Sequence, residues 1–196
     1  MEYSRKDKTI ILNRELSKLD EFVLKFCKNL KDYVVVSGYI SIIFGRSRAT
    51  EDVDLLVRLK DKKEFFDIWN KLKTAEFECI NTSSPDEAFE MLQEFAIRFS
   101  EKGKPIPNME FKTIKTREGE YSFENKITLQ LGNSSIFISP IEMQIAYKLM
   151  LGKNGNRKDI EDAKHLYELF KDKINNKELN NLIDRLNVSE EFEMIK

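Results

Sequence analysis

Two aspartates separated by one residue, Asp52 and Asp54, are the side chains in this sequence whose spacing most clearly suggests chemistry. In a β-strand, side chains at i and i+2 lie on the same face, so these carboxylates stand side by side while Val53 and Leu55 turn into a core. Adjacent carboxylates repel each other unless a cation neutralises them. An oxygen-only pair suits Mg²⁺, which proteins hold with one or two carboxylates together with substrate phosphates. The pair therefore predicts a site for Mg²⁺ or Mn²⁺ that handles a phosphorylated substrate.

A turn of small residues precedes the two aspartates. The apolar segment 34–36 predicts a buried strand that ends at Ser37 and Gly38. Small residues let a phosphate approach the backbone, and the N-terminus of the next helix, expected over 39–46, favours an anion. The order of strand, small turn, helix and second strand over 52–58 therefore predicts that a phosphate binds beside the carboxylates.

This order resembles the signature of the nucleotidyltransferase (DNA polymerase β-like) superfamily. The local form resembles most the minimal and the abortive-infection-type (AbiEii-like) nucleotidyltransferases, in which Gly-x-x-Arg-x-Thr leads into Asp-x-Asp. The matching residues are Gly38, Tyr39, Gly45, Arg48, Thr50, Asp52 and Asp54. Ser37 departs from the pattern, which usually has Gly at that position. The strong match covers residues 33–58, and a weaker one lies near 139–170.

The resemblance implies a reaction in which an acceptor hydroxyl attacks the α-phosphate of an NTP such as ATP, and pyrophosphate leaves. It implies that Asp52 and Asp54 hold Mg²⁺ or Mn²⁺ and that Ser37, Gly38 and Arg48 bind the nucleotide. The implied acceptor is RNA, such as a tRNA end, or a protein side chain, as in toxin–antitoxin systems, where a cognate antitoxin or toxin is a partner. The alternative is a catalytically inactive nucleotide-binding or antitoxin-like module with the same fold.

Sites of this superfamily complete the pair with a third carboxylate from a neighbouring strand, and Glu110 is the candidate here. It lies in segment 109–114, where alternating character predicts a strand. If Glu110 lies on the same face as Asp52 and Asp54, it is expected to bind the metal or to accept a proton from the attacking hydroxyl. The alternative is an ordinary surface glutamate paired with Lys112.

A second group of charged residues, Lys148, Asp159 and Asp162, is similar to a later motif of the abortive-infection-type toxins. The resemblance implies that Lys148 neutralises triphosphate charge and that an aspartate, Asp159 or Asp162, orients it or activates an acceptor. Asp159 and Asp162 are three residues apart and share a helix face. The alternative is an ion-pair latch between consecutive helices.

The composition argues against several other classes of protein. The chain has 196 residues, with 41% hydrophobic and 34% charged, which suits one compact domain with a core. Its net charge of −1 gives no strong overall basicity for nucleic acid. Cys27 and Cys79 lie among apolar residues and are interpreted as core thiols, and with a single histidine a zinc site is not expected. We find no signal peptide and no apolar segment of about 18 residues, so we expect a cytoplasmic protein without membrane contact.

The pattern predicts an α/β (α+β) fold, with a nucleotidyltransferase-like mixed β-sheet flanked by helices and followed by a C-terminal helical tail. Residues 1–138 form the α/β domain, and residues 139–196 form a helical region packed on it. Ser84 and Ser139, each followed by Pro and three residues later by Glu, are expected helix starts. Helices are expected over 14–30, 39–46, 61–75, 84–99, 139–151, 157–171 and 176–186. Strands are expected over 33–37, 52–58, 76–81, 109–114, 123–131 and 135–138, with a loop over 102–107 and a turn over 116–120.

Overall fold

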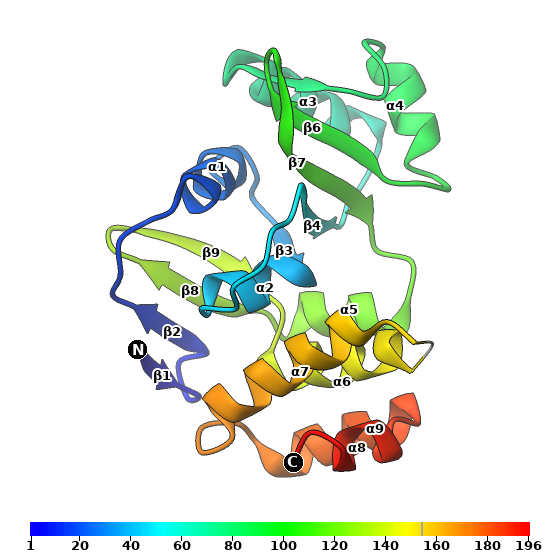
Figure 1. The fold of residues 1–196 in the computed structure, drawn as a ribbon. Coiled ribbons are helices and arrows are strands. Elements are labelled where there is room, and N and C mark those ends of the chain that lie inside the picture. Colours follow the sequence, from blue (N-terminus) through cyan, green and yellow to red (C-terminus); the bar gives the residue numbers. More distant parts are fainter. Residues whose placement is uncertain (154) are drawn as a thin grey trace.

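The computed structural model describes residues 1–153 and 155–196, which form a mixed β-sheet with helices around it (Figure 1). The strands are β1 (Glu2–Ser4), β2 (Thr9–Leu12), β3 (Tyr33–Val36), β4 (Asp52–Val57), β5 (Phe77–Cys79), β6 (Ile97–Glu101), β7 (Lys104–Thr113), β8 (Ile127–Leu131) and β9 (Ser134–Ile138). They form one nine-stranded sheet in the order β1-β2-β8-β9-β3-β4-β7-β6-β5. The pairs β2–β8, β3–β9 and β4–β7 are parallel and the others antiparallel. The predicted mixed sheet is confirmed.

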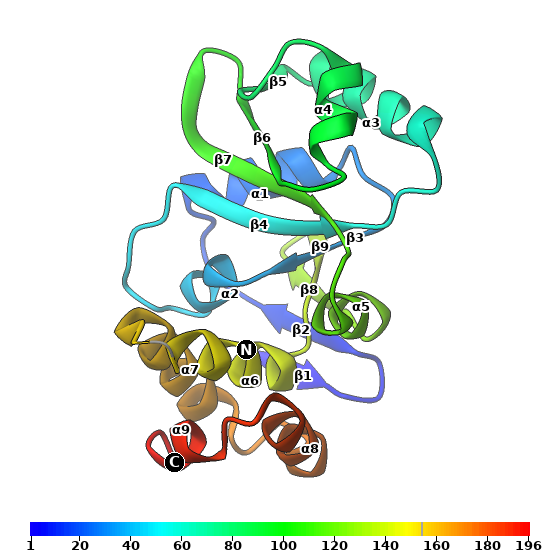
Figure 2. The ribbon, with the colours of Figure 1, turned by 90° about the vertical axis from the view of Figure 1, so that its right-hand side faces the viewer.

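The helices gather mainly at two ends of the molecule. They are α1 (Lys18–Cys27), α2 (Gly38–Ile43), α3 (Lys62–Thr74), α4 (Pro85–Met91), α5 (Arg117–Glu124), α6 (Ile141–Gly152), α7 (Arg157–Phe170), α8 (Asn176–Leu186) and α9 (Ser189–Glu193). Helices α3 and α4 lie at one end with β5 and β6, and α6 to α9 lie at the other (Figures 1 and 2). Within the described residues, none of the helices combines the length and apolar character needed to cross a membrane.

The two faces of β4 and β7 differ in character. Val53 and Leu55 of β4 are fully buried, whereas Asp52 and Asp54, which alternate with them, are half-buried. Phe111 of β7 is also fully buried, and it packs against aromatic rings of α3 and β6. The predicted alternation along β4 is therefore confirmed: one face of these strands belongs to the core, and the other carries polar side chains.

The Ser-Pro-x-Glu pattern predicted the start of α4 correctly and that of α6 incorrectly. Ser84 caps α4 by accepting a hydrogen bond from the backbone N–H of Glu87, as expected. The expected start at Ser139 is wrong in detail, because α6 begins at Ile141 without a side-chain cap. The Ser139 hydroxyl instead bonds the buried hydroxyl of Ser122 on α5.

The expected helix over 84–99 is too long. Helix α4 ends at Met91, and β6 occupies the last part of that range. Ile97 and Phe99 are buried while Arg98 between them is half-buried, which is the two-residue period of a strand. The loop expected over 102–107 is shorter, because β7 already begins at Lys104.

The turn expected over 116–120 is also wrong, because α5 begins there with Thr116 as its cap. The strand expected from residue 123 consequently begins at Ile127. The strands β1 and β2 and the helix α9 were not anticipated. Strands β8 and β9 form an antiparallel hairpin around Gly132, and Trp69 of α3 is buried.

Both cysteines are free thiols. Cys27 is buried, and burial raises the pKa of its thiol to about 12, as expected for a core residue. Cys79 on β5 is half-buried.

Candidate functional site

The turn between β3 and α2 is held in a conformation that favours glycine. Ser37 has φ 64° and ψ −135°, outside the regions that residues with a Cβ normally adopt. Its backbone N–H donates a hydrogen bond to Oε1 of Gln144 on α6 at 3.0 Å. This backbone geometry gives a physical reason why the nucleotidyltransferase pattern has Gly where this chain has Ser37.

Gly38 is small because Arg48 lies over it. A Cβ built on Gly38 would stand 1.8 Å from Nη2 of Arg48. The Arg48 side chain is only 11% exposed and its Nη2 lies 3.4 Å from a carboxylate oxygen of Asp162. The structure therefore links two residues of the sequence pattern through direct packing, and a nucleotide-binding role for either one stays a prediction.

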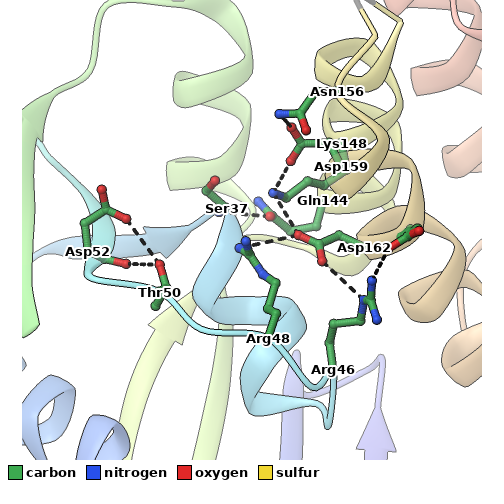
Figure 3. Close-up of polar contacts among 11 residues, drawn as sticks. Ser37, Arg46, Arg48, Thr50, Asp52, Gln144, Lys148, Asn156, Asp159 and Asp162 are labelled. Atoms are coloured by element: carbon green, nitrogen blue, oxygen red, sulfur yellow. Dashed lines mark hydrogen bonds and ion pairs between the residues drawn. The ribbon is translucent and has the colours of Figure 1, made fainter.

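Five charged side chains, which we name the buried charge cluster, connect the α2–β4 loop to α6 and α7. They are Arg46, Arg48, Lys148, Asp159 and Asp162. Lys148 Nζ lies 2.5 Å from Asp159 and 3.1 Å from Asp162, and Asp162 is completely buried. Figure 3 shows Arg46 and Arg48 reaching from the loop toward Asp162.

This arrangement corresponds to the ion-pair alternative for Lys148, since the lysine joins α6 to α7 and its side chain is only 3% exposed. Removing one partner of a buried ion pair typically costs about 3–5 kcal/mol, because a charge is left without compensation. An alanine test of Lys148 thus measures folding together with any nucleotide binding. The roles of Lys148 and Asp159 toward a nucleotide stay predictions.

Asp52 stands at the start of β4, away from the buried charge cluster (Figure 3). The hydroxyl of Thr50 lies 2.9 Å from the Asp52 backbone oxygen and 3.2 Å from its Oδ1. Thr50 therefore fixes the entry of the chain into the strand, which accounts for its place in the sequence pattern.

Asp54 belongs to a row of alternating charges that crosses three strands, which we name the charge ladder: Arg98, Glu110, Lys112 and Asp54. Asp54 is in register with Glu110 on β7, and Glu110 is in register with Arg98 on β6. Nζ of Lys112 lies 2.6 Å from Asp54 Oδ1 and also pairs with Glu110. Arg98 lies 2.6 Å from Glu110. The predicted shared face of Asp54 and Glu110 is present, and so is the predicted alternative contact with Lys112.

The ladder is electrostatically satisfied. Burial acts to raise the pKa of Asp54, but the charge and hydrogen bond of Lys112 outweigh it and hold that pKa below its usual value. Burial acts to lower the pKa of Lys112, yet Asp54 and Glu110 raise it above its usual value. Both partners are therefore charged at neutral pH, and Lys112 supplies the positive charge that the carboxylates need.

The carboxylate oxygens of this region are of the type that binds a magnesium or manganese ion, although Lys112 already neutralises Asp54 and Glu110. Across residues 1–153 and 155–196, no group of three or more His, Cys, Asp or Glu side chains is arranged to hold a metal. Asp54, its register partner Glu110 and Asp52 on the same strand nevertheless offer the oxygen ligands that Mg²⁺ combines with nucleotide phosphates. The types of these ligands suit the ion, and Lys112 now holds the position between Asp54 and Glu110 that the ion would take.

A cavity of about 440 Å³ opens beside the ladder, a size typical of small-molecule sites. Its lining includes Ser37, Asp54, Lys112, Tyr147 and Phe95. The first two are predicted site residues, and the other three were not predicted. The alternation along β7 could have suggested Lys112, whereas no local signal marks Phe95 or Tyr147.

A comparison with solved structures supports the fold assignment. The crystal structure of an antigenic nucleotidyltransferase-like protein from Paracoccidioides brasiliensis superimposes with a TM-score of 0.55 over 88% of each chain, at 17% sequence identity. No family model and no curated protein matches the sequence. The chain thus has a nucleotidyltransferase-like fold.

We expect Gly38→Ala to destabilise the protein by about 1–3 kcal/mol, because the new Cβ must push Arg48 away from Asp162. At an ordinary helical position the same change stabilises by about 1 kcal/mol, so the sign is informative. Urea denaturation measures the effect. In an Arg48→Ala background Gly38→Ala should be neutral or stabilising, and an unchanged penalty there would contradict the packing explanation.

Ser37 offers a second test, since its strain can be separated from its hydroxyl. Ser37→Gly and Ser37→Ala both remove the hydroxyl, but only glycine adopts the left-handed backbone without strain. Ser37→Gly should therefore be more stable than Ser37→Ala by about 1–2 kcal/mol in urea denaturation. Equal stability of the two variants would show that the turn relaxes.

Proposed function

We propose that this protein is a nucleotidyltransferase that transfers an NMP from an NTP to a hydroxyl group of RNA or protein. The observation that supports the proposal most is the register of β4 and β7, which sets Asp54, a residue of the cavity wall, opposite Glu110 on the neighbouring strand. A carboxylate in the wall of a ligand-sized cavity, with a second carboxylate in register on the next strand, suits the binding of a metal-bound triphosphate on a nucleotidyltransferase-like fold.

In this proposal Asp52, Asp54 and Glu110 would hold Mg²⁺ or Mn²⁺. The bound ion supplies charge neutralisation at the phosphate oxygens. Lys112 and Lys115 on the cavity wall attract the phosphates. The acceptor hydroxyl oxygen forms a bond to the α-phosphorus, a carboxylate takes its proton, and the bond to pyrophosphate breaks.

The remaining residues of the sequence pattern position the site. Gln144 holds the backbone of Ser37, and Arg48 covers Gly38. Lys148 and Asp159 fix α6 against α7, and direct contact of Lys148 with a triphosphate requires this pair to open. The sequence resemblance supports an RNA or tRNA acceptor, or a protein acceptor in a toxin–antitoxin pair.

A second candidate, a nucleotide-binding module without turnover, is favoured by one observation. Lys112 already neutralises Asp54 and Glu110, so the carboxylates are satisfied without a metal. Such a module would bind NTP in the same cavity and transfer nothing.

Asp54→Asn should remove nearly all transfer, because losing one fixed electrostatic stabiliser typically costs a factor of about 10²–10³ in rate. The readout is transfer of label from an NTP labelled at the α-phosphate to RNA or protein, with circular dichroism to check folding. Asp86→Asn, at an exposed aspartate of α4, is the matched control and should keep full activity. Undiminished transfer by Asp54→Asn would overturn the mechanism, and no transfer by the wild type with any NTP would favour the second candidate.

Phe95 provides a test of nucleotide binding that leaves the fold intact. Its side chain lines the cavity yet is 64% exposed, so it contributes little to the core. A nucleobase stacked on an aromatic ring gains about 1–3 kcal/mol, and Phe95→Ala should therefore weaken nucleotide affinity by about tenfold or more. Phe95→Tyr should retain affinity, as should Ile106→Ala, a similarly exposed apolar residue on β7. Titration with a fluorescent nucleotide measures these affinities. Equal affinity of Phe95→Ala and the wild type would exclude stacking on Phe95.

A further inference from the structure

Lys112 occupies the place in the charge ladder where the proposed function would put a metal ion. Its Nζ lies 2.6 Å from Asp54 and also pairs with Glu110, so one ammonium group bridges both carboxylates. These are the carboxylates that the proposed function assigns to the metal.

A divalent cation bound between Asp54 and Glu110 would compete with the ammonium group for these carboxylates. Mg²⁺ binds carboxylate oxygens at about 2.0–2.1 Å, and Lys112 already uses Oδ1 of Asp54 and Oε2 of Glu110. Two positive charges this close together also repel each other. Metal binding at Asp54 and Glu110 therefore requires Lys112 to move.

The structure allows this movement for Lys112 but not for the comparable Lys148. The side chain of Lys112 is 35% exposed, whereas that of Lys148 is 3% exposed and fixed between two helices. Lys112 also lines the cavity, together with Lys115 and Thr116 at the start of α5. Its ammonium group can thus turn from the carboxylates into the space that a nucleotide would fill.

We propose that Lys112 is a built-in counter-ion that competes with the divalent cation for Asp54 and Glu110 and moves to the nucleotide phosphates when both ligands bind. This inference rests on the metal site of the proposed function. It makes the protein alone a weak metal binder, and it couples metal binding to nucleotide binding, because each phosphate that Lys112 contacts frees the carboxylates.

The test is the binding of Mn²⁺ alone, without nucleotide, measured from the electron paramagnetic resonance signal of the free ion. Lys112→Met should bind Mn²⁺ about tenfold more tightly than the wild type, or better. Lys104→Met removes an equal charge from the same strand, at an exposed position away from the ladder contacts, and should bind as the wild type does. Lys112→Arg keeps the competing charge and should also resemble the wild type. Adding Asp54→Asn to Lys112→Met should abolish the gain.

Thermal unfolding provides a second readout. Without metal, Lys112→Met leaves Asp54 without its ion-pair partner, while Glu110 keeps Arg98, and the variant should melt at a lower temperature than the wild type. Mn²⁺ should raise its melting temperature more than that of the wild type. If Lys112→Met does not fold, Lys112→Gln, which keeps a hydrogen-bond donor toward Asp54, serves in both measurements.

Equal or weaker Mn²⁺ binding by Lys112→Met or Lys112→Gln overturns the inference. That result, together with label transfer by the wild type, would leave the proposed function standing. Tighter Mn²⁺ binding by these variants supports the inference even if the wild type transfers no label, in which case only the proposed function fails.

Discussion

The parallel pairing of β4 with β7 is the constraint on which the candidate site depends. It sets Asp54 opposite Glu110, and it brings Lys112 within reach of both. The register is fixed by the other face, where Val53 and Phe111 are fully buried. A shift by one residue would turn every side chain of a strand to the opposite face, so the core that stabilises the fold also determines where the charges stand.

The helical C-terminal region contributes to the site from a distance. Asp162 draws Arg48 over Gly38, and Gln144 holds the backbone of Ser37 in its unusual conformation. Buried ion pairs of this kind add little net stability compared with apolar packing, but they tolerate few alternative arrangements. Their value here lies in geometry: they join α6 and α7 to the loop that leads into β4.

The sequence was sufficient for features set by neighbours along the chain, such as the alternation of Asp52, Val53 and Asp54. It was insufficient where a segment distant in the sequence determines the secondary structure or the contacts of a residue. The segment from residue 97 reads as a continuing helix until β7 supplies a strand for it to pair with. The bridging position of Lys112 requires that same pairing, although its spacing from Glu110 was visible. Phe95 reaches the cavity only because the helix before it ends early.

The two ends of the nine-stranded sheet carry a consequence for how the protein behaves among other copies of itself. The outermost strands, β1 and β5, have only three residues each. Longer strands expose rows of unpaired backbone groups on which another chain can add, and short terminal strands limit this risk. The first twelve residues therefore shield the longer edge of β8 from self-association, in addition to extending the sheet.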